Sequence, residues 1–121
     1  MKKIYVAHAS NYSDFKETLY SPLKTLKDFE FIFPYEKEGE MESTKGIIKD
    51  CDLFIGDVSF QKLGTGIEIG WADSFDVPIL LVYKKGSSLS RSLNIVTDNF
   101  LEYDSVEDNL VDIASAINKI I

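Results

Sequence analysis

The sequence is poor in the residues that build disulfides and metal sites. Its 121 residues include one cysteine, Cys51, and one histidine, His8. A lone cysteine excludes an internal disulfide framework and fits a reducing compartment, so we expect a cytoplasmic protein. One cysteine and one histidine also cannot supply the ligands of a usual zinc site. We therefore expect no metal.

Long apolar runs and an excess of basic residues are lacking as well. No run reaches membrane-spanning length, and we expect no signal peptide. The formal net charge is −7. A surface this acidic repels phosphate backbones, so nucleic-acid polymers and anionic membranes are poor partners. A small nucleotide stays compatible, because local N–H groups, hydroxyls and a lysine can hold one phosphate.

Short apolar runs alternate with helical patterns throughout the chain. Runs this short and apolar are typical of strands buried on both faces of a parallel sheet. Pro22 should kink or split the first helix. The expected strands are 3–7, 29–33, 53–55, 79–83 and 100–103. The expected helices are 15–26, 43–50, one from about 66 to 75, 90–95 and 105–120.

Repeated β-α units predict a parallel sheet with helices on both faces. We expect a single α/β domain over 1–121, with a flavodoxin-like, Rossmann-like, doubly wound sheet of five strands in the order 2-1-3-4-5. In such folds the ligand lies at the carboxyl ends of the strands. The loops 8–12, 57–66 and 84–92 should therefore line the pocket. They make His8, Ser10 and Ser59 candidate substrate-binding residues.

The segment with the most chemical information runs from the third strand into the third helix. Asp57 ends the strand, and Gly64-Thr65-Gly66 leads into the helix that carries Glu68. The glycines let a ligand approach the backbone, and the helix start offers unpaired N–H groups. We expect Glu68 in the first helical turn, where the helix dipole favours the ionised carboxylate that a nucleophile requires.

Three familiar motifs do not fit this segment. Ile69 stands where a dinucleotide-binding fingerprint has its third glycine, and the Gly-Lys-Ser/Thr of a P-loop is absent. Asp57 invites comparison with the phosphoacceptor of a receiver domain. That family also has an acidic pair after the first strand and a lysine after the fifth. Here the first strand runs into His8-Ala9-Ser10, and the fifth ends in Glu102-Tyr103-Asp104.

Three stretches resemble the nucleoside 2-deoxyribosyltransferase family. They are DLFIGD at 52–57, LGTGIEIGWA at 63–72 and PIL at 78–80. Within the family, they are most similar to the small branch of 2'-deoxynucleoside 5'-phosphate N-hydrolases. The likeness is strongest from Asp52 to Val82. Its centre is a Gly-x-Gly-x-Glu-x-Gly core after a strand that bears an aspartate.

The resemblance implies cleavage or transfer at the N-glycosidic bond of a (deoxy)nucleoside or its 5'-monophosphate. Glu68 matches the nucleophilic glutamate, which forms a glycosyl-enzyme ester that water or a second base resolves. Tyr5 matches the tyrosine that positions the glutamate, and Asp57 falls where the family has an acidic residue. These three are the candidate catalytic residues. The chemistry requires no metal or organic cofactor.

The resemblance also implies a phosphate subsite and a homodimer or higher homo-oligomer. Lys62 and Ser92 occupy positions where phosphate-cleaving relatives have phosphate-contacting serines, the second from a neighbouring subunit. We therefore expect Ser92 to reach a partner's pocket. Together with Gly64 and Gly66, these residues complete the candidate substrate-binding set.

Two positions depart from the family pattern. His8 stands where relatives have a glycine, which narrows the pocket. Relatives also carry a catalytic aspartate before the third strand. That position is Thr44 here, and Glu40 and Glu42 are the nearest carboxylates. If neither reaches the pocket, the leaving base lacks its usual proton donor.

Two other functions stay open. The segment YVAHAS at 5–10 resembles the opening strand and loop of Toll/interleukin-receptor domains, which would make the chain an interaction or signalling module. The missing aspartate also fits a nucleotide-binding sensor that has lost catalysis. The place of Glu68, after Gly-x-Gly at the third helix, favours the glycosidic function over the signalling module.

Overall fold

The computed structural model describes residues 1–36 and 44–121. Five strands form one sheet in the order β2-β1-β3-β4-β5, and each neighbouring pair is parallel. The predicted doubly wound fold and its strand order are thereby confirmed. The strands are β1 (Lys2–Ala7), β2 (Phe29–Ile32), β3 (Leu53–Asp57), β4 (Ile79–Lys84) and β5 (Phe100–Tyr103).

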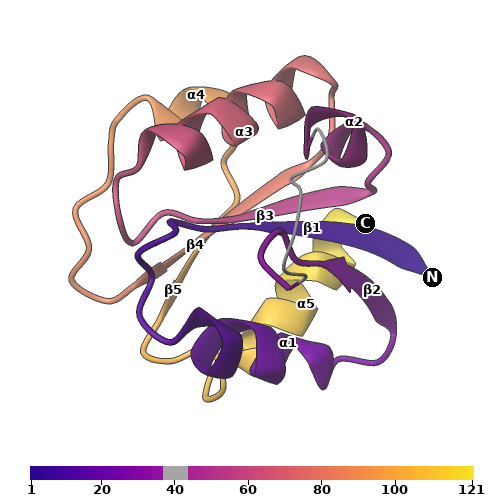
Figure 1. Cartoon of the computed structure of the whole chain (residues 1–121), viewed down its shortest axis with the longest axis vertical. Helices are drawn as coiled ribbons and strands as arrows, with labels where there is room; N and C mark the ends of the chain where they lie inside the picture. Colours follow the sequence, from indigo (N-terminus) through magenta and orange to yellow (C-terminus); the bar gives the residue numbers. More distant parts are fainter. Residues whose placement is uncertain (37–43) are drawn as a thin grey trace.

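Helices cover both faces of the sheet (Figure 1). One face carries α2 (Thr44–Lys49), α3 (Leu63–Ser74) and α4 (Leu93–Val96). The other carries a short π-helix, η1 (Lys16–Tyr20), followed by α1 (Ser21–Lys24), and also α5 (Leu110–Ile120). No helix in the described ranges is long and apolar enough to span a bilayer.

Two local signals in the sequence shape the helices on the second face. Pro22 lies in the first turn of α1, where its missing N–H costs little, and the π-helical hydrogen bonding ends just before it. Because Ser21 follows Tyr20 directly and both residues have helical backbone angles, Pro22 marks a change from π- to α-helical hydrogen bonding and not a break in the helix. Ser105 Oγ accepts the N–H of Asp108 over 3.0 Å, but α5 itself begins only at Leu110.

Side chains alternate along each strand and fill two apolar cores. On β1, Ile4 and Val6 face the core beneath α1 and α5, whereas Tyr5 and Ala7 face the core beneath α3. On β3, Leu53 and Ile55 share the first core and Phe54 the second. This alternation decides where each strand-end residue points.

The start of α3 differs from the prediction. The helix begins at Leu63, after an extended Lys62, and no acidic residue lies in its first turn. Glu68 therefore lies in the second turn. The prediction that a first-turn position lets the helix dipole favour its ionised form is wrong. The buried stripe of α3 already begins at Thr65 and continues with Ile69 and Ala72. Packing of this stripe holds the first turns helical despite glycine's low helix propensity.

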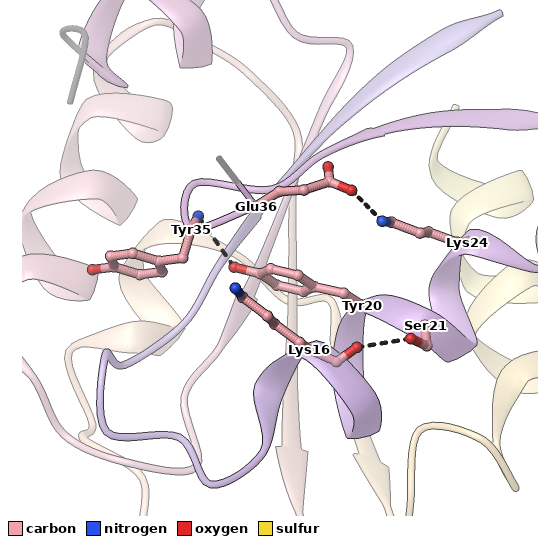
Figure 2. Close-up of polar contacts among 6 residues, drawn as sticks. All are labelled: Lys16, Tyr20, Ser21, Lys24, Tyr35 and Glu36. Carbon is pink, nitrogen blue, oxygen red and sulfur yellow. Dashed lines mark hydrogen bonds and ion pairs between the residues drawn. The ribbon is translucent and has the colours of Figure 1, made fainter. Parts of the chain in front are cut away.

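The end of β2 is tied to the helices beside it. The backbone N–H of Tyr35 donates to Tyr20 Oη over 3.4 Å, and the Lys24 ammonium pairs with Glu36 (Figure 2). The candidate carboxylates Glu40 and Glu42 lie outside the described residues. Thr44 is the first residue of α2.

Candidate active site

Tyr5 and Glu68 form a hydrogen-bonded pair between β1 and α3. Tyr5 points toward α3 because of its place in the strand alternation, and its Oη donates to Glu68 Oε2 over 2.5 Å. The ring of Phe54, its register partner on β3, stacks against Tyr5 with centroids 5.7 Å apart. Tyr5 is 1% exposed, whereas Glu68 is half-buried. The sheet therefore fixes the tyrosine, and the tyrosine fixes one oxygen of the carboxylate.

Burial controls the protonation of both groups. It raises the pKa of Glu68 above its usual range, and the hydrogen bond from Tyr5 lowers that pKa in part. Burial, together with the neighbouring Glu68, raises the pKa of Tyr5, so the phenol keeps its proton and acts as the donor. A partly desolvated carboxylate, held by one neutral donor, is suited to attack an electrophilic carbon.

Asp57 belongs to a separate hydrogen-bond network. Its side chain is 1% exposed, it accepts the Tyr103 hydroxyl, and it accepts the N–H of Ser59 over 2.9 Å. Tyr12 Oη lies 2.8 Å from Tyr103 Oη. Burial raises the pKa of Asp57, and the hydrogen bonds from Tyr103 and Ser59 offset part of the rise. The network links the loop after β1 to the ends of β3 and β5.

His8 packs at the end of β1 as a neutral side chain. It is 3% exposed, and its Nδ1 lies 2.8 Å from the carbonyl oxygen of Ala9. A carbonyl only accepts, so Nδ1 carries the proton and Nε2 accepts from Tyr20 Oη over 2.5 Å. Burial lowers the pKa of His8. Four aromatic rings surround the imidazole at centroid distances of 4.8 to 6.0 Å: Tyr12, Phe15, Tyr20 and Tyr35.

The residues predicted to bind substrate do not all gather around Glu68 within the chain. Lys62, Gly66 and Ser92 line a cavity of about 540 Å³. This cavity lies between α3 and the segment leading into α4, whereas Glu68 reaches across to β1 from the same helix. The other candidates are dispersed. Gly64 and Ser10 are exposed, and Ser59 Oγ accepts the backbone N–H of Lys84 over 2.8 Å.

Sequence reasoning did not single out Tyr12, Tyr20 or Tyr103. Tyr103 ends β5, and Asp57 ends β3, at the same edge of the sheet. This shared position is the feature of the sequence from which their contact could have been predicted. Within residues 1–36 and 44–121, no three His, Cys, Asp or Glu side chains gather closely enough to hold a metal ion.

Comparison with known proteins gives one sequence relative. No family model matches the sequence. A curated protein of Syntrophotalea carbinolica, named for 2'-deoxynucleoside 5'-phosphate N-hydrolase activity, is 30% identical over 64 residues. The matched segment spans 50% of this chain and 45% of that protein, so the chain matches less than half the length of its relative.

Two solved structures share the fold over nearly their whole length. A 2-deoxyribosyltransferase from Leishmania mexicana covers 95% of this chain and 98% of its own, with a TM-score of 0.66 and 20% identity. A CMP N-glycosidase from Clostridium botulinum covers 93% and 99%, with a TM-score of 0.64 and 24% identity. The sequence match and the shared fold confirm the resemblance to the nucleoside 2-deoxyribosyltransferase family that the Gly-x-Gly-x-Glu-x-Gly segment predicts.

Proposed function

We propose that this chain cleaves or transfers the N-glycosidic bond of a nucleoside or nucleotide, with Glu68 as its nucleophile. The observation that carries the proposal is the Tyr5–Glu68 pair, which holds a half-buried carboxylate near the carboxyl ends of a parallel sheet. The relatives support the bond type, because their names specify a deoxynucleoside phosphate N-hydrolase, a deoxyribosyltransferase and a CMP N-glycosidase.

The reaction proceeds in two displacements. Tyr5 occupies Glu68 Oε2, which leaves Oε1 to form a bond to the anomeric carbon while the C–N bond to the base breaks. The base departs with the electron pair of that bond and takes up a proton from solvent, and the water that later resolves the ester returns a proton to solvent. Water or a second base then attacks the same carbon and releases Glu68, with net retention. A 2-deoxy sugar suits this route, because no 2-hydroxyl withdraws electrons from the developing cation.

A second candidate is a nucleotide-binding sensor without catalysis. Thr44, at the start of α2, stands where relatives have an aspartate, and a hydroxyl is a poor proton donor to a leaving base. Such a protein would bind a nucleotide without releasing base. The comparisons do not favour the signalling-module alternative.

Measurement of base release distinguishes these functions. The chain is incubated with deoxynucleosides, ribonucleosides and their 5'-monophosphates, with and without a free acceptor base, and released base is quantified by chromatography. We expect release by the wild type and loss of roughly 10²-fold or more in Glu68→Gln, because the amide cannot form the ester. Glu107→Gln, at an exposed glutamate before α5, is the matched control.

Each result has one interpretation. Release that persists in Glu68→Gln refutes the nucleophile assignment. Nucleotide binding without release in the wild type supports the sensor instead.

A further inference from the structure

The hydrogen-bond network around Asp57 has no step in the proposed reaction. Asp57 follows Ile55 on the same face of β3, and both Ile55 and Tyr103 belong to the apolar core beneath α1 and α5. Tyr5 instead faces the core beneath α3, where it meets Glu68. Asp57 and Glu68 therefore act from opposite faces of the sheet.

Both carboxylate oxygens of Asp57 already have protein partners. Oδ1 accepts the N–H of Ser59 over 2.9 Å, and Oδ2 accepts the Tyr103 hydroxyl. The residue is 1% exposed. A general acid or base must come within hydrogen-bond reach of the substrate, and neither oxygen can do so without losing its present partner. Asp57 therefore acts through these two partners.

The Oδ1 bond fixes the chain that leads into α3. A side-chain oxygen that accepts the N–H two residues on closes a turn, here directly after β3. Ser59 Oγ also accepts the backbone N–H of Lys84 over 2.8 Å, which attaches this turn to the end of β4. The chain then runs through residues 58–62 into α3, the helix that carries Glu68.

The Oδ2 bond fixes the turn after β1. Tyr103 donates its one hydroxyl hydrogen to Asp57, so Tyr12 donates to Tyr103 over 2.8 Å. Tyr12 is itself the last residue of a turn, because its N–H donates to the carbonyl oxygen of Ala9 over 3.1 Å. Ser10, an exposed candidate for substrate binding, lies inside this turn.

The two segments also touch each other directly. The rings of Tyr12 and Phe60 pack edge to face with centroids 5.7 Å apart. Lys84 Nζ lies 4.6 Å from the centroid of the Tyr12 ring and 5.8 Å from that of Phe60, so one cation contacts both rings. Segments 9–12 and 58–62 thus form one unit at the carboxyl ends of the strands.

We propose that Asp57 is a positioning residue, which holds segments 9–12 and 58–62 together and thereby places Ser10 and Glu68 around the substrate. It touches no reacting atom. This inference rests on the proposed function, because base release is the reaction whose geometry Asp57 sets. A positioning role is fulfilled by any side chain that makes the same hydrogen bonds, whereas an acid–base role requires the carboxyl group.

Three variants separate the two hydrogen bonds. Asp57→Asn keeps both, because its amide oxygen accepts from Ser59 and its NH₂ group donates to Tyr103 Oη, whose own hydrogen then turns to Tyr12. Asp57→Ala removes both bonds. Tyr103→Phe removes only the connection to segment 9–12.

The matched control is Asp52→Ala, at the other end of the same strand. Asp52 directly precedes β3, and its Oδ2 accepts the backbone N–H of Lys3 over 2.8 Å. The control therefore also removes a carboxylate that bonds to the backbone, but at the edge of the sheet opposite to the proposed site. We expect its kcat and KM to match those of the wild type.

Base release should respond differently in each variant. We expect Asp57→Ala to lower kcat by roughly 10- to 100-fold, because a small displacement of the nucleophile Glu68 costs that much. Tyr103→Phe should raise KM several-fold and change kcat little, since the connection to α3 is kept. Asp57→Asn should recover most of the activity that Asp57→Ala loses, with the acidic limb of its kcat/KM profile at the wild-type pH.

Hydrogen exchange of the backbone amides measures the same connections without turnover. We expect faster exchange in segments 9–12 and 58–62 of Asp57→Ala, and in segment 9–12 alone of Tyr103→Phe. Exchange in these segments should stay at the wild-type rate in Asp57→Asn and Asp52→Ala.

Two results would overturn the proposal. The first is an Asp57→Asn variant as inactive as Asp57→Ala, which would show that the carboxyl group itself takes part in the reaction. The second is wild-type exchange of segment 9–12 in Tyr103→Phe, a result that stays decisive even where Asp57→Ala does not fold. A wild type that releases no base would refute the proposed function instead, and the exchange rates would still show whether Asp57 joins the two segments.

Discussion

At the residue scale, the Tyr5 hydroxyl has two effects on Glu68 that a pH profile can separate. It holds Oε2 in place, and it lowers a pKa that burial raises. In Tyr5→Phe the carboxylate loses this donor, so its pKa rises further. The nucleophile must be ionised, and therefore the acidic limb of kcat/KM should move to higher pH.

The measurement is kcat/KM for base release against pH in the wild type and in Tyr5→Phe. A variant whose activity falls by the same factor at every pH would contradict the effect on the pKa and leave only positioning. A limb that moves to lower pH would contradict the assignment of Glu68 as the titrating nucleophile.

The site residues differ in how far the sequence could predict them. Glu68 follows from a local motif, and Tyr5 was linked to it by resemblance alone. The partner of Asp57 was harder to predict, because its bond to Tyr103 joins residues 46 positions apart. Only the sheet register brings such residues together.

At the scale of elements, α3 offers a test of why glycine occupies its exposed side. An added Cβ at Gly66 or Gly70 would meet nothing within 4 Å, so packing within the protomer does not require glycine there. Alanine lowers the conformational entropy of the unfolded chain. We expect Gly66→Ala and Gly70→Ala each to raise the free energy of unfolding by about 0.5–1 kcal/mol.

The two variants should differ in activity. Gly66 lies one helical turn closer than Gly70 to the start of α3, where a ligand can reach the backbone. We expect kcat/KM to fall in Gly66→Ala and to stay unchanged in Gly70→Ala. Unchanged activity in both would show that no substrate approaches the backbone at Gly66. Urea unfolding and base-release assays supply the two measurements.

The strands were easier to predict than the start of α3. Each strand is a short apolar run between polar segments, and repeated β-α units permit few topologies. Gly64-Thr65-Gly66 instead indicated a loop, because glycine has a low helix propensity. The segment is helical instead, because Thr65, Ile69 and Ala72 form one buried stripe of α3. Only the packed sheet shows that Thr65 lies inside the stripe.

At the scale of the whole molecule, the predicted homodimer stays a prediction that exposed apolar residues make testable. Leu63 and Ile67 on α3 are 82% and 45% exposed, and Ile95 on α4 is 85% exposed. Burial of such side chains would drive association of two copies. We expect light scattering to give a mass near twice the 13.7 kDa of the chain.

A matched pair of variants locates the contact. Ile95→Asp should yield the monomer, because it places a charge on α4 next to Ser92. Val111→Asp should stay dimeric, because Val111 is 82% exposed on α5, across the sheet. A wild-type mass near 13.7 kDa would remove the expected role of Ser92 in a partner's pocket.

The stability of the whole fold should depend on pH, because burial shifts the pKa values of its buried groups in opposite directions. Burial lowers the pKa of His8 in the folded state, so its contribution is present above about pH 6.5 and is lost as the pH falls below that value. Burial raises the pKa of Asp57 and Glu68, so their contribution is lost as the pH rises through their folded values. The wild-type curve alone mixes these effects.

His8→Gln isolates the histidine. Glutamine does not titrate, and its amide oxygen can still accept from Tyr20 Oη, the present partner of the imidazole. The free energy of unfolding of the wild type, minus that of the variant, should fall as the pH drops from about 7 toward 5, by at most about 1.4 kcal/mol per pH unit. The cause is proton uptake by His8 in the unfolded chain, which the buried imidazole resists in the folded one. Urea unfolding at several pH values measures the difference, and parallel curves for the two proteins would show that His8 binds protons equally well in both states.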